Sequence, residues 1–234
     1  RGAPFWAWNC ELDKDVLCEQ IEYLNEMGFG GFHMHSRSGL ATDYLSEEFF
    51  GLVKSCVEKA KKENMLAYLY DEDRWPSGFA GGLVTKERKY RGRFIHFTKA
   101  KETDVYDEKT GIEKGLTYLF ACYDIEIDED GTLKYYKCIG ENEEAEHNKW
   151  YAYVKTFEDS PRYNNQAYVD TLSKEAIDKF IEVTHEAYKK HVGDEFSKTI
   201  PSIFCDEPQF STKETIENSR ECTSVKYPWT PLLP

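Results

Sequence analysis

The stretch MLAYLYDEDRW, residues 65–75, decides the fold: a short apolar run predicts a buried strand, and it ends abruptly in three acidic residues. The segments PFWAW (4–8), FGGFHMH (29–35) and IPSIFC (200–205) repeat this design, since each is apolar and runs into polar or aromatic residues. Strands of this kind, separated by helical segments, predict a parallel sheet with right-handed crossovers.

Helical periodicity fills two of the intervals between these strands. Asp13 and Ser46 stand where helix N-caps belong, and apolar residues recur behind each of them at a spacing of three or four. A third helix is expected after Ser173. The pattern predicts an α/β fold: the N-terminal half of a (β/α)₈ TIM barrel, with an open doubly wound sheet as the alternative.

Between the third strand and the third helix the rhythm changes. Four segments rich in Tyr, Phe and Ile follow, and Asp130-Gly131 between two of them is a hairpin signal. We therefore predict an inserted antiparallel β-subdomain at 93–168. The barrel strands occupy 1–92 and 169–210, and the proline-containing tail, 211–234, is expected to be loop or the start of a missing remainder.

Composition limits the classes of partner. The chain of 234 residues carries a formal net charge of −13, so phosphate backbones and anionic membranes would be repelled, and neither nucleic acid nor membrane is expected. Its 7 cysteines show no zinc spacing, and several fall on apolar faces, so we expect reduced thiols and a cytoplasmic protein. No metal site or cofactor is predicted.

The candidate site follows from the parallel order, because active sites of such barrels lie at the carboxyl ends of the strands. Indole rings pack on the apolar faces of sugars, and carboxylates, amides and guanidinium groups pair with their hydroxyls. Glu207 is the candidate general acid/base, since glycoside cleavage needs a carboxylic acid at the bond. The expected substrate-binding residues are Trp8, Asn9, His35, Arg37, Asp71, Asp73, Trp75 and Asp206.

Structural roles are open for several of these residues. Trp8 could belong to the core, Arg37 could form an ion pair, and Asp71 and Asp73 could cap the following turn. A hydrogen-bonded structural role is open for His33 as well. For Glu207 we expect an extended backbone, because Pro208 follows it, and a pKa raised by partial burial beside Asp206.

Five separated blocks carry a resemblance to a known family: RGAPFWAWN, MGFGGFHMHSRSGL, YLSEEFF, YLYDEDRWPSGFAGG and IPSIFCDEPQF. Together they resemble a bacterial glycoside hydrolase family with a rhamnosidase-type barrel, which implies hydrolysis of O-glycosidic bonds. Asp206-Glu207-Pro208 also resembles the Asn-Glu-Pro step of retaining glycosidases, which implies the acid/base role for Glu207, with Asp206 in the place of Asn. In those enzymes the second carboxylate lies on a later strand.

Two rival functions remain open at this point. A metal-dependent sugar isomerase or hydrolase on the same barrel would use His33, His35, Asp71 and Glu207 as metal ligands. A non-catalytic carbohydrate-binding fragment would need no second carboxylate. The expected partners are a carbohydrate substrate and either the remaining half of the barrel or a second copy of the chain.

Overall fold

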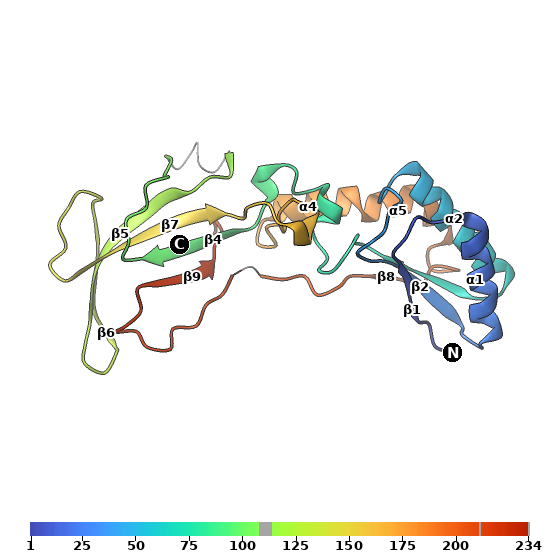
Figure 1. Ribbon diagram of the computed structural model, residues 1–234, viewed down its shortest axis with the longest axis horizontal. Helices are drawn as coiled ribbons and strands as arrows, with labels where there is room; N and C mark the ends of the chain where they lie inside the picture. Colours follow the sequence, from blue (N-terminus) through green and yellow to red (C-terminus); the bar gives the residue numbers. More distant parts are fainter. Residues whose placement is uncertain (108–113, 211, 234) are drawn as a thin grey trace. The chain divides into compact units, whose positions relative to one another are not determined.

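The computed structural model describes residues 1–107, 114–210 and 212–233. The chain divides into two compact units (Figure 1). Unit 1 consists of Arg1–Val84 and Ile177–Pro208, and unit 2 consists of Thr85–Ala176 and Gln209–Pro234.

Unit 1 contains a four-stranded sheet. Its strands are β1 (Phe5–Trp8), β2 (Gly31–Ser36), β3 (Leu66–Tyr70) and β8 (Ile203–Phe204), in the order β1-β2-β3-β8. Every neighbouring pair is parallel. The carboxyl ends of the four strands therefore lie at one end of the sheet, as predicted. The fourth strand is shorter than the predicted 200–205, and Cys205, expected inside it, is exposed.

The helices of unit 1 begin where the sequence places their caps. Asp13 accepts hydrogen bonds from the backbone N–H groups of Asp15 and Val16 before α1 (Lys14–Glu26). Ser46 accepts one from Phe49 before α2 (Glu47–Lys62). The predicted third helix is divided into α4 (Lys174–Val183) and α5 (His185–Val192).

The break between α4 and α5 has a local cause. The Thr184 hydroxyl donates to the carbonyl oxygen of Phe180 at 2.6 Å, a side-chain contact with the preceding turn that bends helices. Thr184 itself has φ −105° and ψ −73°. The helical direction therefore changes at this residue, and α5 begins with His185.

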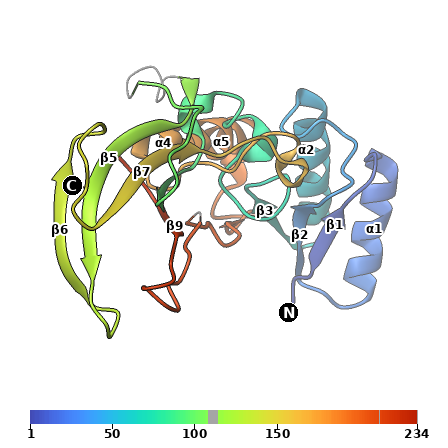
Figure 2. The same ribbon diagram turned by 60° about the vertical axis from the view of Figure 1, so that its left-hand side comes forward.

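One face of the sheet packs against helices. Trp8, Phe32 and Leu69 belong to a buried core that also includes residues of α1, α2 and α5. Figure 2 shows α1 and α2 beside β1 and β2. The indole of Trp8 meets the ring of Phe49 edge-on, with 5.7 Å between centroids. This interdigitation of large rings anchors the sheet on its helical layer.

The opposite face of the sheet carries a different set of rings, which we call the aromatic face: Phe5, His33, His35, Tyr68, Tyr70 and Phe204. The rings of His33 and Tyr68 stack with centroids 4.4 Å apart, and those of His35 and Tyr70 meet at 4.0 Å. Strand alternation explains the separation, since Phe32 and Met34 face the helices while the two histidines face away. Phe5 stays 58% exposed, so this face is only partly covered.

Unit 2 is an antiparallel sheet, which confirms the predicted insertion. Its strands are β4 (Arg93–Thr98), β5 (Tyr118–Ile127), β6 (Leu133–Ile139), β7 (Asn148–Thr156) and β9 (Ser224–Pro228), in the order β6-β5-β7-β4-β9. Asp130-Gly131 lies in the β5–β6 hairpin, and Gly131 has φ +90°, a value that favours glycine. Short 3₁₀ helices cover Ala80–Gly82, Arg88–Tyr90, Pro161–Tyr163 and Gly193–Glu195.

The expectation of loop for residues 211–234 is wrong for its middle part. There β9 pairs with β4, with Ile95 opposite Tyr227. Pro228 is the last residue of this outermost strand, a position that tolerates the missing N–H. The prolines therefore end a strand in this tail and do not exclude one.

The unit boundaries also differ from the predicted ones at 92/93, 168/169 and 210/211. Arg91 forms a bridge with Val169, and the Asp170 N–H donates to the carbonyl oxygen of Tyr90 at 2.8 Å. These contacts join residues 85–92 to residues 169–176, so both segments belong to unit 2. No described helix is long and apolar enough to cross a membrane.

Candidate functional site

The strand ends of unit 1 bring polar and aromatic side chains together, which we call the strand-end cluster: Arg37, Tyr70, Trp75, Asp206 and Glu207. The indole nitrogen of Trp75 donates to Glu207 Oε2 at 3.1 Å. Arg37 and Tyr70 are close enough to Asp206 to affect its titration. Four of the predicted site residues therefore meet at the carboxyl end of the sheet.

Glu207 is exposed and has φ +44°, in the left-handed region. The prediction of an extended backbone before Pro208 is wrong. A non-glycine residue in this region carries strain of about 1–3 kcal/mol, which persists only where surrounding contacts fix the conformation. Here the bond from Trp75 holds the carboxylate, and hydrogen bonds between Ser77 and Asp206 hold the preceding backbone. Such strain is concentrated at functional sites.

Asp206 carries a raised pKa. Burial is the main cause, and the neighbouring Glu207 charge adds to it, while Arg37 and the nearby Tyr70 hydroxyl act in the opposite direction. The prediction had assigned partial burial to Glu207, but its carboxylate lies in solvent and Asp206 is the half-buried member. The pair therefore places one shielded and one accessible carboxyl group side by side.

Asp71 is fully buried, and both of its oxygens have partners. The Ser77 hydroxyl donates to Oδ1 at 2.6 Å, and His185 Nε2 lies 3.1 Å from Oδ2. Both carboxylate oxygens of Asp71 are therefore bonded to groups of the protein itself. The predicted substrate contact by Asp71 is therefore replaced by an internal structural role.

Glu72 is also fully buried, and its carboxylate organises the loop that follows β3. It accepts five backbone hydrogen bonds at 2.6–2.9 Å, from Asp73, Gly78, Phe79, Ala80 and Gly81. Burial raises the pKa of Glu72 to about 8, and the N–H donors act against that rise. The glycine-rich run 78–82, with Gly81 at φ +61°, wraps around this side chain.

The remaining predicted residues are distributed differently. Trp8 is 1% exposed in the helix-facing core, so the predicted sugar contact by Trp8 is wrong, because odd and even positions of β1 face opposite sides. Asp73 is buried and accepts a hydrogen bond from Arg74 Nε at 2.8 Å. Asn9 is exposed beyond the end of β1, beside the loop that contains Gly39.

His35 lies on the aromatic face and contacts Arg37 of the strand-end cluster. Arg37 Nη1 donates to His35 Nε2 at 3.3 Å. A guanidinium cannot accept a hydrogen bond, so the proton of the neutral imidazole is on Nδ1. This atom is buried and has no hydrogen-bond partner among the residues that the structure describes. Burial, followed by the charges of Arg37 and His33, lowers the pKa of His35 to about 4. His35 is therefore neutral at physiological pH.

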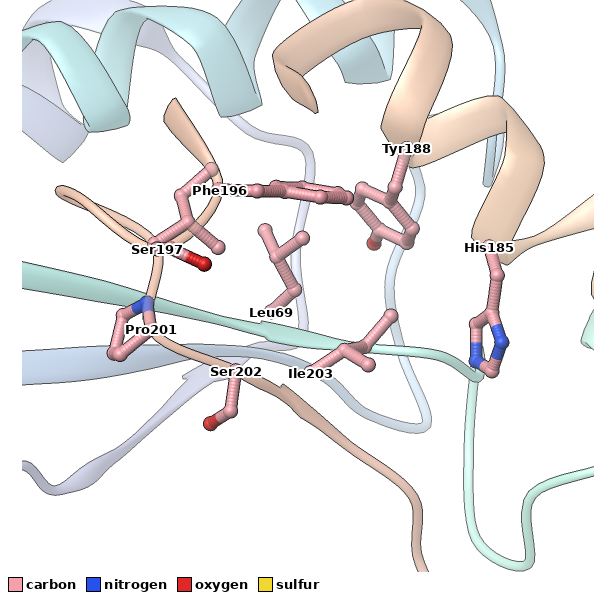
Figure 3. A pocket seen from close by; sticks show the side chains of 9 residues that line it. Leu69, His185, Tyr188, Phe196, Ser197, Pro201, Ser202 and Ile203 are labelled. Atoms are coloured by element: carbon pink, nitrogen blue, oxygen red, sulfur yellow. The ribbon is translucent and has the colours of Figure 1, made fainter. Parts of the chain in front are cut away.

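A separate pocket of about 250 Å³ lies beside β8 and α5. Figure 3 shows His185 at one end and Phe196 with Ser197 at the other, and Leu69 and Ile203 lie between them. Apolar side chains dominate the lining. None of the predicted site residues lines this pocket. Two contacts connect it to the strand ends: His185 with Asp71, and the Tyr188 hydroxyl with the carbonyl oxygen of Tyr70.

The candidate metal ligands do not come together. Among residues 1–107, 114–210 and 212–233, no group of three or more His, Cys, Asp or Glu side chains is placed to hold a metal ion. The set His33, His35, Asp71 and Glu207 is thus not assembled as a ligand group. All seven cysteines are free.

Three contributors to the site were missed in the sequence: Ser77, His185 and Tyr70. Ser77 follows Trp75-Pro76 and had been assigned only to a loop. His185 begins a short helix that the sequence pattern merges with the one before it. Tyr70 is the last residue of its strand, and the alternation along β3 could have placed it on the same face as His35.

Comparison with known proteins adds no relative. No protein-family model matches the chain. No curated protein and no solved structure matches it either. The geometry at the carboxyl end of the four parallel strands is therefore the main basis for assigning a function.

Proposed function

We propose that the chain is a catalytic portion of a glycoside hydrolase and that Glu207 is its general acid/base. One observation carries the proposal: a solvent-accessible carboxylate at the carboxyl end of a parallel sheet is held in a strained conformation by an indole N–H. The family resemblance of the strand-end blocks supports the same assignment. Strain at an accessible carboxylate favours a catalytic role over a solvent-exposed loop acid.

The four strands of unit 1 are, in this proposal, part of a (β/α)₈ barrel. The spatial order β1-β2-β3-β8 follows the chain order without reversal, whereas a doubly wound sheet reverses its order at a switch point. Helices α1, α2 and α5 all contribute to the core on one face, as they would outside a barrel. The aromatic face would then line the interior, closed by further strands or by a second copy of the chain.

The strand-end cluster would divide the chemistry among its members. Glu207 would donate a proton to the glycosidic oxygen as its bond to the anomeric carbon breaks, so that the leaving group departs as an alcohol. Water would supply the new oxygen on the anomeric carbon, directly or after a second carboxylate from a later strand has formed an intermediate. Trp75 would fix the direction of that carboxylate through its indole N–H, and Arg37 would pair with sugar hydroxyls. Asp206, whose pKa is raised mainly by burial, would be the shielded carboxyl group beside Glu207. The seven free thiols support a cytoplasmic location as part of the proposal.

The test compares Glu207→Gln with wild type on two kinds of glycoside. With an unactivated leaving group, the substitution should lower turnover by about 10²- to 10⁴-fold, the range for a positioned proton-transfer group. With a nitrophenol-class leaving group, which departs without protonation, the loss should be much smaller. Glu58→Gln, an exposed change within α2, is the matched control and should leave both rates unchanged.

Equal rates for wild type and a folded Glu207→Gln variant would contradict the assignment. Sugar binding without any hydrolysis by wild type would favour the carbohydrate-binding alternative instead. Isothermal titration with a panel of mono- and oligosaccharides separates these outcomes, because it detects binding independently of turnover.

A further inference from the structure

Ser77 occupies an unusual position for a loop serine, because it is fully buried and bonded to two acidic residues. Its hydroxyl donates to Asp71 Oδ1 at 2.6 Å and accepts from the Asp206 N–H at 2.8 Å. Its own N–H donates to the Asp206 carbonyl oxygen at 2.9 Å. The loop after β3 is thereby attached to both backbone polar groups of Asp206.

The turn at Asp206–Glu207 needs such an attachment. The strand that delivers it, β8, has two residues, and its partner β3 pairs with it only at Leu69 and Tyr70. The ladder therefore ends before the turn, where Glu207 must hold φ +44°. Without further contacts, a residue before proline would relax toward extended conformations.

Asp71 sets the direction of the Ser77 hydroxyl. The Asp206 N–H can only donate, so the Ser77 oxygen accepts there and its hydroxyl proton is directed to Asp71. The second Asp71 oxygen contacts His185 at 3.1 Å, which fixes the carboxylate. Asp71 thus acts on the acidic turn through Ser77.

The loop that carries Ser77 is itself fixed by the buried Glu72 carboxylate. Glu72 accepts N–H groups from Gly78 to Gly81, immediately after Ser77. Trp75, two residues before Ser77, bonds the Glu207 carboxylate. One loop therefore holds the acidic turn at its backbone and at its reactive side chain.

We infer that Ser77 is a positioning residue that fixes the Glu207 carboxylate, acting through the Asp206 backbone under the control of Asp71. The effect of Ser77 on catalysis rests on the proposed function, but its effect on the position of the Glu207 carboxylate does not. The inference explains why Asp71 and Ser77, two buried polar residues, are bonded to the turn that carries the exposed Glu207 carboxylate.

The experiment reads the Glu207 position without requiring activity. In ¹⁵N-labelled protein, the indole N–H of Trp75, assigned with Trp75→Phe, should shift with pH as Glu207 titrates, and Glu207→Gln should abolish that shift. Ser77→Ala should remove at least half of its amplitude. Ser55→Ala removes a helix hydroxyl bonded to the Gly51 carbonyl and should change nothing.

Further variants keep the inference falsifiable. Ser77→Cys keeps a weak donor and acceptor and should retain an intermediate amplitude, and it replaces Ser77→Ala if the latter does not fold. Asp71→Asn retains an acceptor oxygen, so its pH-dependent shift of the Trp75 indole N–H should lose less amplitude than that of Ser77→Ala. A folded Ser77→Ala protein with an unchanged Trp75 response would overturn the inference.

Where the protein hydrolyses a glycoside, Ser77→Ala should lower kcat by about 10- to 100-fold, a typical effect of misplacing a catalytic group. KM should change little, and the limb of the pH profile that reports Glu207 should move. An inactive wild type, or a fully active Glu207→Gln variant, would remove the proposed function while leaving the Trp75 measurement valid. The two failures are therefore distinguishable.

Discussion

The indole nitrogen of Trp75 and the Oε2 atom of Glu207 lie 3.1 Å apart, although 132 positions separate them in the chain. The contact joins the loop after β3 to the turn after β8. Most of unit 2 lies between these two segments in the chain, so the contact joins parts of unit 1 that are far apart in sequence. The acidic turn is therefore a property of tertiary structure, and local sequence does not determine it.

The left-handed backbone at Glu207 leads to a prediction about stability. The free energy of unfolding should be about 1 kcal/mol higher for Glu207→Gly than for Glu207→Ala, because glycine adopts positive φ without steric cost. Chemical denaturation of the two variants measures the difference. At Glu58, inside α2, the same pair should show the reverse order, since glycine is about 1 kcal/mol worse than alanine within a helix. Equal stabilities at position 207 would mean that the positive φ carries no strain.

The Glu72 carboxylate should be among the most sensitive positions for stability. Glu72→Gln turns an amide group toward backbone donors, leaving some of them buried and unpaired, and should lower the free energy of unfolding by about 2–4 kcal/mol. Urea denaturation at pH 9, above the Glu72 pKa of about 8 so that the carboxylate is ionised, measures the loss. The exposed substitution Glu58→Gln should stay within about 0.5 kcal/mol of wild type. A Glu72→Gln protein as stable as wild type would contradict the loop-organising role.

His35 should make stability depend on pH in one window. Its pKa is lowered to about 4 in the folded protein, mainly by burial, from an ordinary value near 6.5. As pH falls below 6.5, the unfolded chain takes up a proton that the folded protein refuses, so stability is lost between pH 6.5 and 4. His35→Phe should remove this component from urea denaturation curves recorded across the window. An unchanged pH dependence in that variant would assign the effect to other groups.

Cys205 should react slowly despite its exposure. Partial loss of hydration and the nearby Asp71 carboxylate raise the pKa of its thiol to about 12, and the thiolate is the reactive form. Asp71→Asn should therefore speed alkylation of Cys205 by iodoacetamide about three- to tenfold at fixed pH. Peptide mass spectrometry follows Cys205, and exposed Cys10 serves as the internal reference. A rate that Asp71→Asn leaves unchanged would show that Asp71 does not control the thiol.

Local sequence signals predicted the elements well where short-range contacts determine them. The caps at Asp13 and Ser46 depend on backbone groups two or three residues away, and the Asp130-Gly131 hairpin on adjacent conformations. These signals are complete within a short window, so the sequence was sufficient. The parallel order of the strands followed from the helices between them.

Other features depend on partners that are distant in sequence. Tail strand β9 needs β4 to form, and its proline content pointed to loop. The helix-facing position of Trp8 needs the register of β1, which a single apolar run does not fix. The roles of Asp71 and Glu72 depend on a folded loop, because adjacent carboxylates have no preferred partner until Ser77 and the 78–81 N–H groups surround them.

The two segments of unit 2 are synthesised at different times, because a segment of unit 1 separates them in the chain. During translation, β4 ends at Thr98, but β9, which covers its outer edge, begins only at Ser224. The other partner of β4, β7, ends at Thr156. Between the synthesis of β7 and that of β9, β4 keeps one unpaired row of N–H and C=O groups, a template for pairing with another strand. Residues 177–208 of unit 1 emerge from the ribosome in that interval. Vectorial synthesis therefore delivers the last segment of unit 1 before β9, the last strand of the unit 2 sheet.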